Sequence, residues 1–254
     1  MKTYRWWSNA AARWLFLAGL AGAACAASAA DPSQFSEAER QLFVRPHLAA
    51  VALPARLHYR YQRSGDLEPE VTDHAVLSIA TKFGARTADV EYLSAERKLE
   101  LPPTTDVEGN PIILHFLERE VRELKRLTGG SIGFYRSRIR KALAGDASVR
   151  QVEVDHDGRM LKAVEIRIEP FVNDPARSRF EEFADRYYVM VLSPDIPGEV
   201  YQLKAALPGR AEGAAGGEAG EKATAPATGQ ATGQSSRSVA HAEVLTFERQ
   251  ESGH

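Results

Sequence analysis

The feature that most constrains the fold is a repeated alternation of apolar and polar side chains along short segments. The clearest example is residues 164–168, where Val164, Ile166 and Ile168 alternate with charged residues. A period of two places such apolar side chains on one face of a β-strand. We therefore expect a sheet with a buried face. The expected strands cover residues 57–61, 75–83, 89–93, 97–101, 152–154, 164–168, 187–192, 201–205 and 242–249.

Two of these strands carry additional signals. Residues 187–192 are apolar at both odd and even positions, which is typical of a strand covered on both faces. The segment Asp155-His156-Asp157-Gly158 predicts a hairpin turn, because Asp-Gly favours two-residue turns. The same segment resembles the start of a calcium loop, but its spacing departs from the EF-hand and the bidentate glutamate is missing. We interpret it as a plain turn.

Three segments predict helices. A Ser-x-x-Glu capping box opens the first, over residues 36–44. Asn110 and Pro111 are typical of a helix start, and apolar residues at helical spacing continue from there to Gly129. A third helix is expected over residues 131–143. The chain is therefore of the α+β class, with an antiparallel sheet of about nine strands, an N-terminal helix and two internal helices.

The first 30 residues have the three parts of a secretory signal peptide. They contain three basic residues and no acidic one, followed by an apolar run of eleven residues from Trp14 to Ala24. That run is too short to span a membrane, which takes about 20 helical residues. Small residues at 27–30 then fit the cleavage rule. We predict export to the periplasm by a cleaved Sec-type signal; an uncleaved membrane anchor is the alternative.

Cys25 is the only cysteine of the chain. Cleavage after Ala29 or Ala30 leaves a mature protein without disulfides, thiol nucleophiles or thiolate metal ligands. In the other interpretation Cys25 is the acylated first residue of a lipoprotein. Gly22-Ala23-Ala24-Cys25 resembles a bacterial lipobox, except that Gly22 stands where that motif usually has leucine. Membrane association is expected only if Cys25 is lipidated.

Composition divides the remainder of the chain. Residues 31–207 and 240–250 are expected to form a single α+β domain. Residues 208–239 are rich in Ala, Gly, Thr, Glu and Gln and contain no aromatic residue, so they predict a disordered low-complexity loop. Beyond the signal, 29 basic residues face 34 acidic ones. This acidic balance argues against nucleic-acid binding, which depends on clustered Lys and Arg.

The sequence contains no catalytic or cofactor motif. There is no G-x-S-x-G, H-E-x-x-H, P-loop or dinucleotide-binding glycine pattern. We therefore expect no cofactor and no enzymatic activity, with an unrecognised hydrolase as an alternative. His115 and Glu118 lie three apart on a predicted helix and are a weak candidate metal pair, because no second motif supplies the other ligands. The alternative is a solvated helix face.

Two surfaces are candidate binding sites. Aromatic residues on alternating strands are a candidate apolar ligand face, although the same pattern is typical of an ordinary core. Basic residues on the two internal helices are candidate contacts for an anion or lipid head group, or simply a solvated face with i,i+4 pairs such as Glu118–Arg122. The aromatic set is Tyr59, Tyr61, Phe83, Tyr92, Tyr187 and Tyr201, and the basic set is Arg119, Arg122, Arg126, Arg136 and Arg140.

The order of these elements (signal, helix, strands, two helices, strands) resembles that of periplasmic lipoprotein carriers and outer-membrane lipoprotein receptors of the LolA/LolB type. The resemblance covers residues 36–249 at the level of topology, with no matching family motif, so no functional residues carry over. It implies a curved antiparallel sheet, an incomplete β-barrel, that wraps helices and shelters acyl chains. Residues 109–121 also look like uncharacterised exported proteins of proteobacteria, which implies a location and no activity.

These observations lead to three functional hypotheses. The first is a non-enzymatic periplasmic protein that binds a lipid, a lipoprotein or an envelope protein through a curved sheet. The second is a structural or interaction protein of the cell envelope whose sheet is merely packed and holds no small ligand. The third is a hydrolase, which a cleft with a carboxylate or histidine pair of perturbed protonation would favour.

Overall fold

The computed structural model describes residues 34–208 and 239–252. They form one nine-stranded sheet in the order β4-β3-β2-β1-β9-β8-β7-β6-β5, with all neighbours antiparallel. The sheet is open and does not close into a barrel, so the α+β class and the incomplete barrel are confirmed. The strands are β1 Ala55–Gly65, β2 Val71–Lys82, β3 Ala85–Tyr92, β4 Thr104–Thr105, β5 Ser148–His156, β6 Arg159–Ile168, β7 Tyr187–Leu192, β8 Val200–Pro208 and β9 Val239–Ser252.

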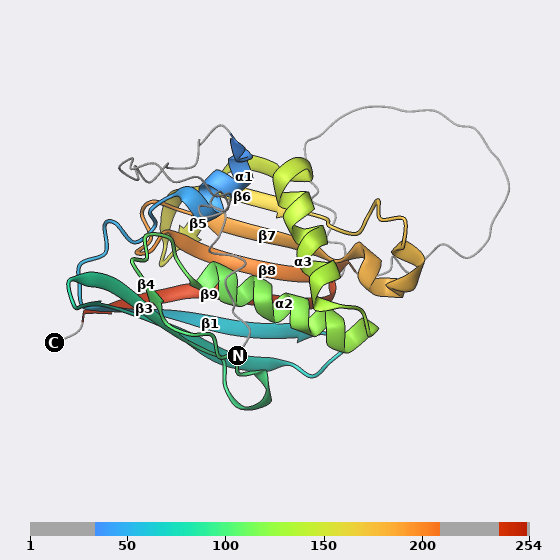
Figure 1. The fold of residues 1–254 in the computed structure, drawn as a ribbon, viewed down its shortest axis with the longest axis horizontal. Coiled ribbons are helices and arrows are strands. Elements are labelled where there is room, and N and C mark those ends of the chain that lie inside the picture. The colour runs from blue at the N-terminus through green and yellow to red at the C-terminus, as the bar shows by residue number, and fades with distance from the viewer. Residues whose placement is uncertain (1–33, 209–238, 253–254) are drawn as a thin grey trace, which may run out of the picture.

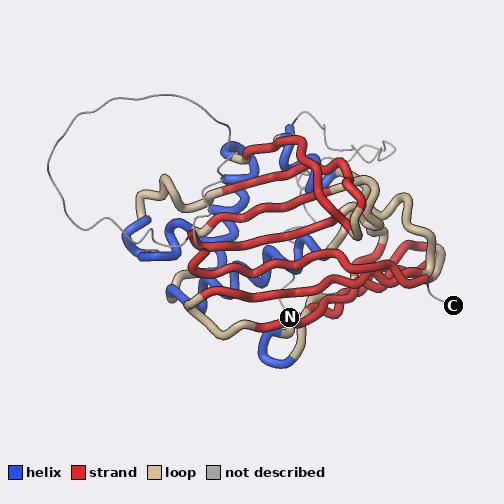
Figure 2. Tube along the Cα trace, turned by 180° about the vertical axis from the view of Figure 1, so that it is seen from behind, coloured by secondary structure: helices blue, strands red, loops and turns tan. Residues whose placement is uncertain are grey.

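The helices lie on one face of this bent sheet (Figure 1). Seen from behind, the strands stand in front of them and the opposite face carries no helix (Figure 2). The concave, helix-covered face is called the inner face below. The helices are α1 Glu37–Glu39 with the π-helical turn η3 Arg40–Val44, α2 Ile112–Thr128, and α3 Ile132–Lys141 with η5 Ala142–Asp146; short 3₁₀ turns are η4 Ala95–Arg97, η6 Arg177–Arg179 and η7 Glu181–Asp185.

The last strand joins the two halves of the sheet. Leu245 of β9 lies opposite Tyr61 of β1 on one side and opposite Leu203 of β8 on the other. The expectation that residues 242–249 return to the sheet is confirmed. The predicted loop before them falls almost wholly outside the described residues, and so does the predicted signal peptide with Cys25. Within 34–208 and 239–252, no helix has the length and apolar character to cross a membrane.

Local signals set most element boundaries as expected. The Asn110 side chain accepts a hydrogen bond from the Ile112 amide at 3.1 Å, so it caps the start of α2. Gly129 ends that helix in the left-handed region at φ 72°. Asp157 and Gly158 both have positive φ and form the two-residue turn between β5 and β6.

The strand expected over residues 97–101 is wrong. Its place is taken by the 3₁₀ turn η4 and a single bridge between Tyr92 and Leu99. The sheet still has nine strands because the short β4, which follows Pro103, was not expected. The cause is a tertiary contact. Asp73 accepts hydrogen bonds from the Ser94 amide at 3.0 Å and from the Arg97 guanidinium at 3.0 Å, which holds the chain in a turn.

The inner face and the helices share one core. Leu57, Leu77 and Leu245 of the sheet and Leu117 and Val121 of α2 are all fully buried. A buried stripe on α2 therefore packs against every second residue of the neighbouring strands, as the two periodicities require.

Strand β7 is covered less completely than expected. Tyr188 and Met190 are fully buried on the inner face, whereas Tyr187 and Val189 are only half-buried on the other face. The expectation of a strand covered on both faces is therefore wrong for its first half, because no helix lies over the outer face (Figure 2).

Candidate functional site

Three of the six candidate aromatic residues come together on the inner face. Tyr59, Tyr61 and Tyr92 have exposures of 0%, 1% and 1%, beneath α2. The Tyr59 ring lies edge-on to Phe247, with centroids 5.7 Å apart, and Tyr92 stacks on His115 at 5.9 Å. The first of these pairs links neighbouring strands and the second links the sheet to α2.

The other three candidates lie outside this cluster, and the prediction of one shared face is wrong for Phe83 and Tyr187. Phe83 is fully exposed in the β2–β3 turn, where Phe83 and Gly84 both have positive φ. Tyr187 points to the outer face, with the Arg167 guanidinium 4.0 Å from its ring centroid. Tyr201 is half-buried in a bulge of β8, and its hydroxyl donates to the Asp155 carbonyl at 2.7 Å.

The basic candidates also divide between surface and interior. Arg119 is 8% exposed and contacts Glu243 of β9 through an ion pair, so it does not belong to a head-group surface. Arg122 and Arg136 both bind Glu118, at 3.3 Å and 2.6 Å, which confirms the expected i,i+4 pair. The exposed Arg126 pairs with Glu123 and with Glu68, and Arg140 is also exposed.

His115 and Glu118 do not form a metal pair. The Nδ1 atom of His115 lies 2.9 Å from the Pro111 carbonyl, and its ring stacks on Tyr92. Both carboxylate oxygens of Glu118 are taken by Arg136. The two side chains are buried and used in packing and ion pairing, which differs from both the metal site and the solvated face considered above.

The most unusual feature of the interior is a cluster of charges between α2 and the sheet. Arg186, 0% exposed, donates from Nη2 and Nε to Glu120 Oε2 at 2.6 Å and 3.0 Å. Arg119, the neighbour of Glu120 on α2, contacts Glu243, and its Nη1 atom lies 3.6 Å from Glu120 Oε1. Two carboxylates and two guanidinium groups are thus buried together; these four residues are called the charge cluster.

The sequence contained a signal for this cluster that was missed. Glu120 lies in the stripe of Phe116, Leu117, Val121 and Leu124, so helical spacing alone places it toward the core. Glu243 likewise has the parity of Leu245 and Phe247 on β9, which face inward. A charged residue inside an apolar stripe is a candidate buried ion pair, because an isolated buried charge is too costly.

The two carboxyl groups have opposite pKa shifts. Burial raises the pKa of Glu120 to about 8, with Arg186 opposing this shift and the charge of Glu243 adding to it. The pKa of Glu243 is instead lowered well below its ordinary value. Burial acts to raise it, but the hydrogen bond from His241 and the positive charge of Arg119 outweigh the effect of burial. Near neutral pH the pair therefore carries roughly one negative charge beside two positive ones.

Several polar atoms around the cluster lack hydrogen-bond partners within the described part of the chain. Nearly all such buried groups in proteins are paired with protein, water or ligand. Among them are the Tyr92 hydroxyl and Nη1 of Arg186, together with one ring nitrogen each of His115 (Nε2) and His241 (Nδ1). The Tyr61 and Tyr188 hydroxyls, by contrast, interact with Glu243 and Arg186.

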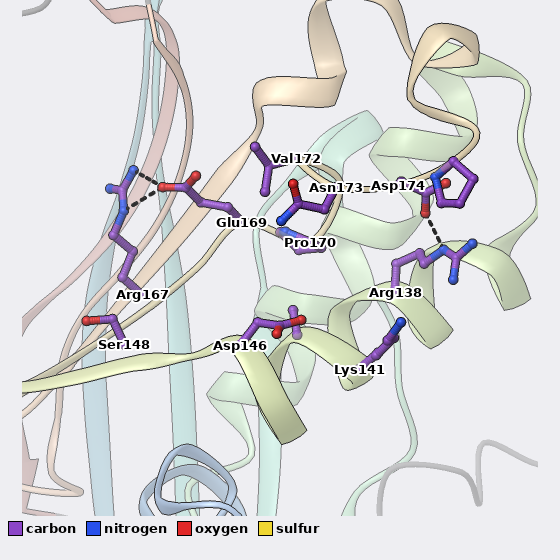
Figure 3. Close-up of a pocket in the computed structure, with 12 residues that line it drawn as sticks. Arg138, Lys141, Asp146, Ser148, Arg167, Glu169, Pro170, Val172, Asn173 and Asp174 are labelled. Atoms are coloured by element: carbon purple, nitrogen blue, oxygen red, sulfur yellow. Dashed lines mark hydrogen bonds and ion pairs between the residues drawn. The ribbon is translucent and has the colours of Figure 1, made fainter.

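Three cavities open at the surface of the described residues. The cavity in Figure 3, about 360 Å³, lies between α3 and residues 169–175, where Arg138 is bound by Asp174 and Arg167 by Glu169. A second, about 390 Å³, lies over β1–β3 beside Pro103, and a third, about 280 Å³, lies between Gly130 and Phe180. No residue of the charge cluster lines any of these three.

Comparisons with known proteins are consistent with the topology and go no further. No family model matches the chain, and no curated protein matches its sequence. The lipoprotein LppX of Mycobacterium tuberculosis is similar over 78% of this chain and 87% of its own, with 10% identity and a TM-score of 0.31. A LolA superfamily protein of Nitrosomonas europaea is similar over 79% of this chain and 86% of its own, with 10% identity and a TM-score of 0.20. Both similarities are weak and concern topology alone.

The substitution Glu120→Gln is expected to remove a pH dependence of stability. The folded-state pKa of Glu120, about 8, exceeds its ordinary value of 4.5, so the folded protein binds the extra proton between these values. The stabilising contribution of Glu120 to the free energy of unfolding is therefore fully present below pH 4.5. It falls as the pH rises to 8, by up to about 1.4 kcal/mol per pH unit. Urea unfolding at several pH values measures this difference. If the difference in free energy of unfolding between the wild type and the variant stayed constant between pH 5 and 8, the prediction would be wrong.

Proposed function

We propose that the protein is an exported, non-enzymatic component of the cell envelope that binds a lipid, or the lipid-bearing end of a lipoprotein, between α2 and the inner face of its sheet. The observation that supports this most strongly is the set of unpaired polar atoms around the charge cluster. A ligand with a polar head and an apolar body that entered between helix and sheet would supply the missing partners.

The interior has the amphipathic character that such a ligand requires. One part is apolar and aromatic, with Leu57, Tyr59 and Phe247 on adjacent strands. The other part is charged, with Glu243 of β9 and Arg186 ahead of β7. An acyl chain would lie along the apolar part, and its head group would accept hydrogen bonds at the charged part.

Uptake requires α2 to move relative to the sheet. The charge cluster is fully buried and none of the three cavities described above reaches it. Contacts between α2 and the sheet run through side chains, which can separate without breaking the ladder of strands.

Removing an unpaired tyrosine hydroxyl is expected to separate binding from stability. In Tyr92→Phe the ligand-free protein should be as stable as the wild type or more so, because an unsatisfied buried group costs about 1–3 kcal/mol. Affinity for a fluorescent fatty acid should fall. Tyr135→Phe is the matched control: this buried hydroxyl on α3 pairs with the Thr128 hydroxyl and lies outside the proposed site, so its loss should reduce stability and leave affinity unchanged.

The direct test is solvent extraction and mass spectrometry of the protein recovered from its native envelope. A copurifying acyl-containing lipid, displaced by the fluorescent fatty acid, supports the proposal. Material that carries no lipid and does not bind the probe contradicts it and favours an interaction protein with a packed sheet. The same mass spectrum reports the cleavage site and any acyl group on Cys25.

The hydrolase alternative has one supporting feature, the two carboxyl groups with opposite pKa shifts. Both are enclosed and bound to arginine, and a substrate needs a cleft that reaches them. Ester or glycoside hydrolysis that is abolished by Glu120→Gln would favour the hydrolase over the binding protein.

A further inference from the structure

We propose that Glu68, His241 and Glu243 form a binding site for a divalent metal ion of the zinc class. One ligand atom from each residue lies within 4.8 Å of the other two. His241 and Glu243 are two apart on β9 and share the inner face, while Glu68 comes from the connection between β1 and β2. Two segments distant in sequence thus bring one imidazole and two carboxylates together.

The backbone holds these two segments close to each other. Gly65 lies opposite His241 in the β1–β9 ladder, and the Asp66 amide donates to the Ala240 carbonyl at 2.9 Å. A side chain at Gly65 would place its Cβ 2.3 Å from the Ala240 oxygen, and its φ of 118° also favours glycine. This close approach positions Glu68 over the beginning of β9.

The imidazole provides an independent sign that a ligand is missing. The His241 side chain is 3% exposed, its Nε2 atom lies 3.4 Å from Glu243 Oε1, and its Nδ1 atom has no partner within the described residues. The Tyr61 hydroxyl, on the same face and two register positions from Glu243, is equally buried and interacts with the Glu243 carboxylate. A buried ring nitrogen without a partner is expected beside an ion or water that completes it.

The donor set selects the kind of ion. Histidine nitrogen and carboxylate oxygen are ordinary zinc ligands, and three protein ligands leave a fourth position for water or the Tyr61 hydroxyl. Calcium prefers six to eight oxygens, so an imidazole with two carboxylates disfavours it. We therefore infer a site for Zn²⁺ or a similar first-row ion.

Neighbouring arginines set the strength of this site. Arg119 contacts Oε2 of Glu243 and leaves Oε1 on the side of His241. Glu68 is bound by Arg63 at 3.0 Å and by Arg126 at 2.6 Å. Arg126 has a second partner in Glu123 and is 55% exposed, so a metal can displace it from Glu68 easily. These cations oppose a metal charge, so the affinity should be lower than in a closed structural zinc site.

The test is titration of the full-length recovered protein, first stripped with a chelator, with ZnCl₂ alone. Calorimetry should show one equivalent bound and thermal unfolding should shift upward, with no such response to CaCl₂. His241→Gln and Glu68→Gln should weaken Zn²⁺ binding by at least about tenfold, since even outer-shell substitutions cost that much. His74→Ala, at a 61%-exposed histidine 3.6 Å from Glu248 on the other face, is the control and should bind as the wild type does.

Cobalt provides a readout that does not depend on stability. Co²⁺ bound through His241 should give a visible absorption band that Zn²⁺ displaces and that His241→Gln lacks. Absence of any bound equivalent would overturn the proposal, and so would binding lost in His74→Ala but kept in His241→Gln. The fatty-acid titration should be run on the same chelator-stripped protein, so that failure of the metal site leaves the proposed lipid binding untouched.

Discussion

Glu120→Leu is expected to lower the free energy of unfolding by about 3–5 kcal/mol, the cost of leaving the buried guanidinium of Arg186 without the carboxyl group that binds it. Arg186 has no exposed surface, and two of its nitrogens donate to a single oxygen of Glu120. A guanidinium cannot shed its proton to escape the interior, so leucine leaves a buried charge facing apolar atoms. Urea unfolding at pH 7 measures the loss.

Two matched variants show whether the ion pair is the cause. Glu120→Gln keeps an oxygen that can accept from Arg186, so it should lose less than half as much stability as the leucine variant. The double variant Glu120→Leu/Arg186→Met should recover most of the loss, because replacing a whole buried pair by apolar groups is often neutral or stabilising. Equal losses in the leucine and glutamine variants, or no recovery in the double variant, would show that Glu120 acts through packing alone.

Asn110→Ala is expected to destabilise the fold by about 3–5 kcal/mol, the sum of a lost helix cap and two buried groups left unpaired. The Asn110 amide nitrogen donates to the Tyr59 hydroxyl at 3.0 Å and to the Gly198 carbonyl at 2.9 Å. Its oxygen accepts from the Ile112 amide at 3.1 Å. One buried side chain thus joins β1, the start of α2 and the β7–β8 turn. Chemical denaturation measures the effect.

Ser131→Ala supplies the control for that substitution. Ser131 caps α3 by accepting from the Phe134 amide at 3.2 Å, but it is exposed and makes no other tertiary hydrogen bond among those described. Its loss should cost about 1 kcal/mol, the ordinary value of an N-cap. If Asn110→Ala cost no more than Ser131→Ala, the two buried hydrogen bonds would contribute nothing.

Helices and most strands could be predicted because their signals are local. The alternation of residues 164–168, the Asp157-Gly158 turn and the Asn110 cap each depend on side chains a few residues apart. Residues 97–101 failed as a strand because Asp73, far away in the sequence, binds Ser94 and Arg97. No local pattern contains that contact.

The candidate site was harder to predict than the fold. Alternation along a strand assigns each side chain to one face of the sheet. The turn at Phe83 and the bulge at Tyr201 break this alternation, so the face of these two residues could not be predicted. Arg119 was grouped with the basic residues of the two helices because of its charge, although it lies on the buried side of α2. A shift of one residue along either element changes which side chains face the core.

The sequence by itself determined the order of helices and strands, their caps and turns, and the antiparallel α+β class, because each depends on the preferences of neighbouring residues. Only the tertiary structure decided that β9 lies between β1 and β8 and that four charged side chains meet inside. Arg119 and Glu243 are 124 residues apart, and Glu120 and Arg186 are 66 apart. Such pairs form because an unpaired charge is too costly to bury, and the partner that relieves this cost is chosen by the packing of the whole domain.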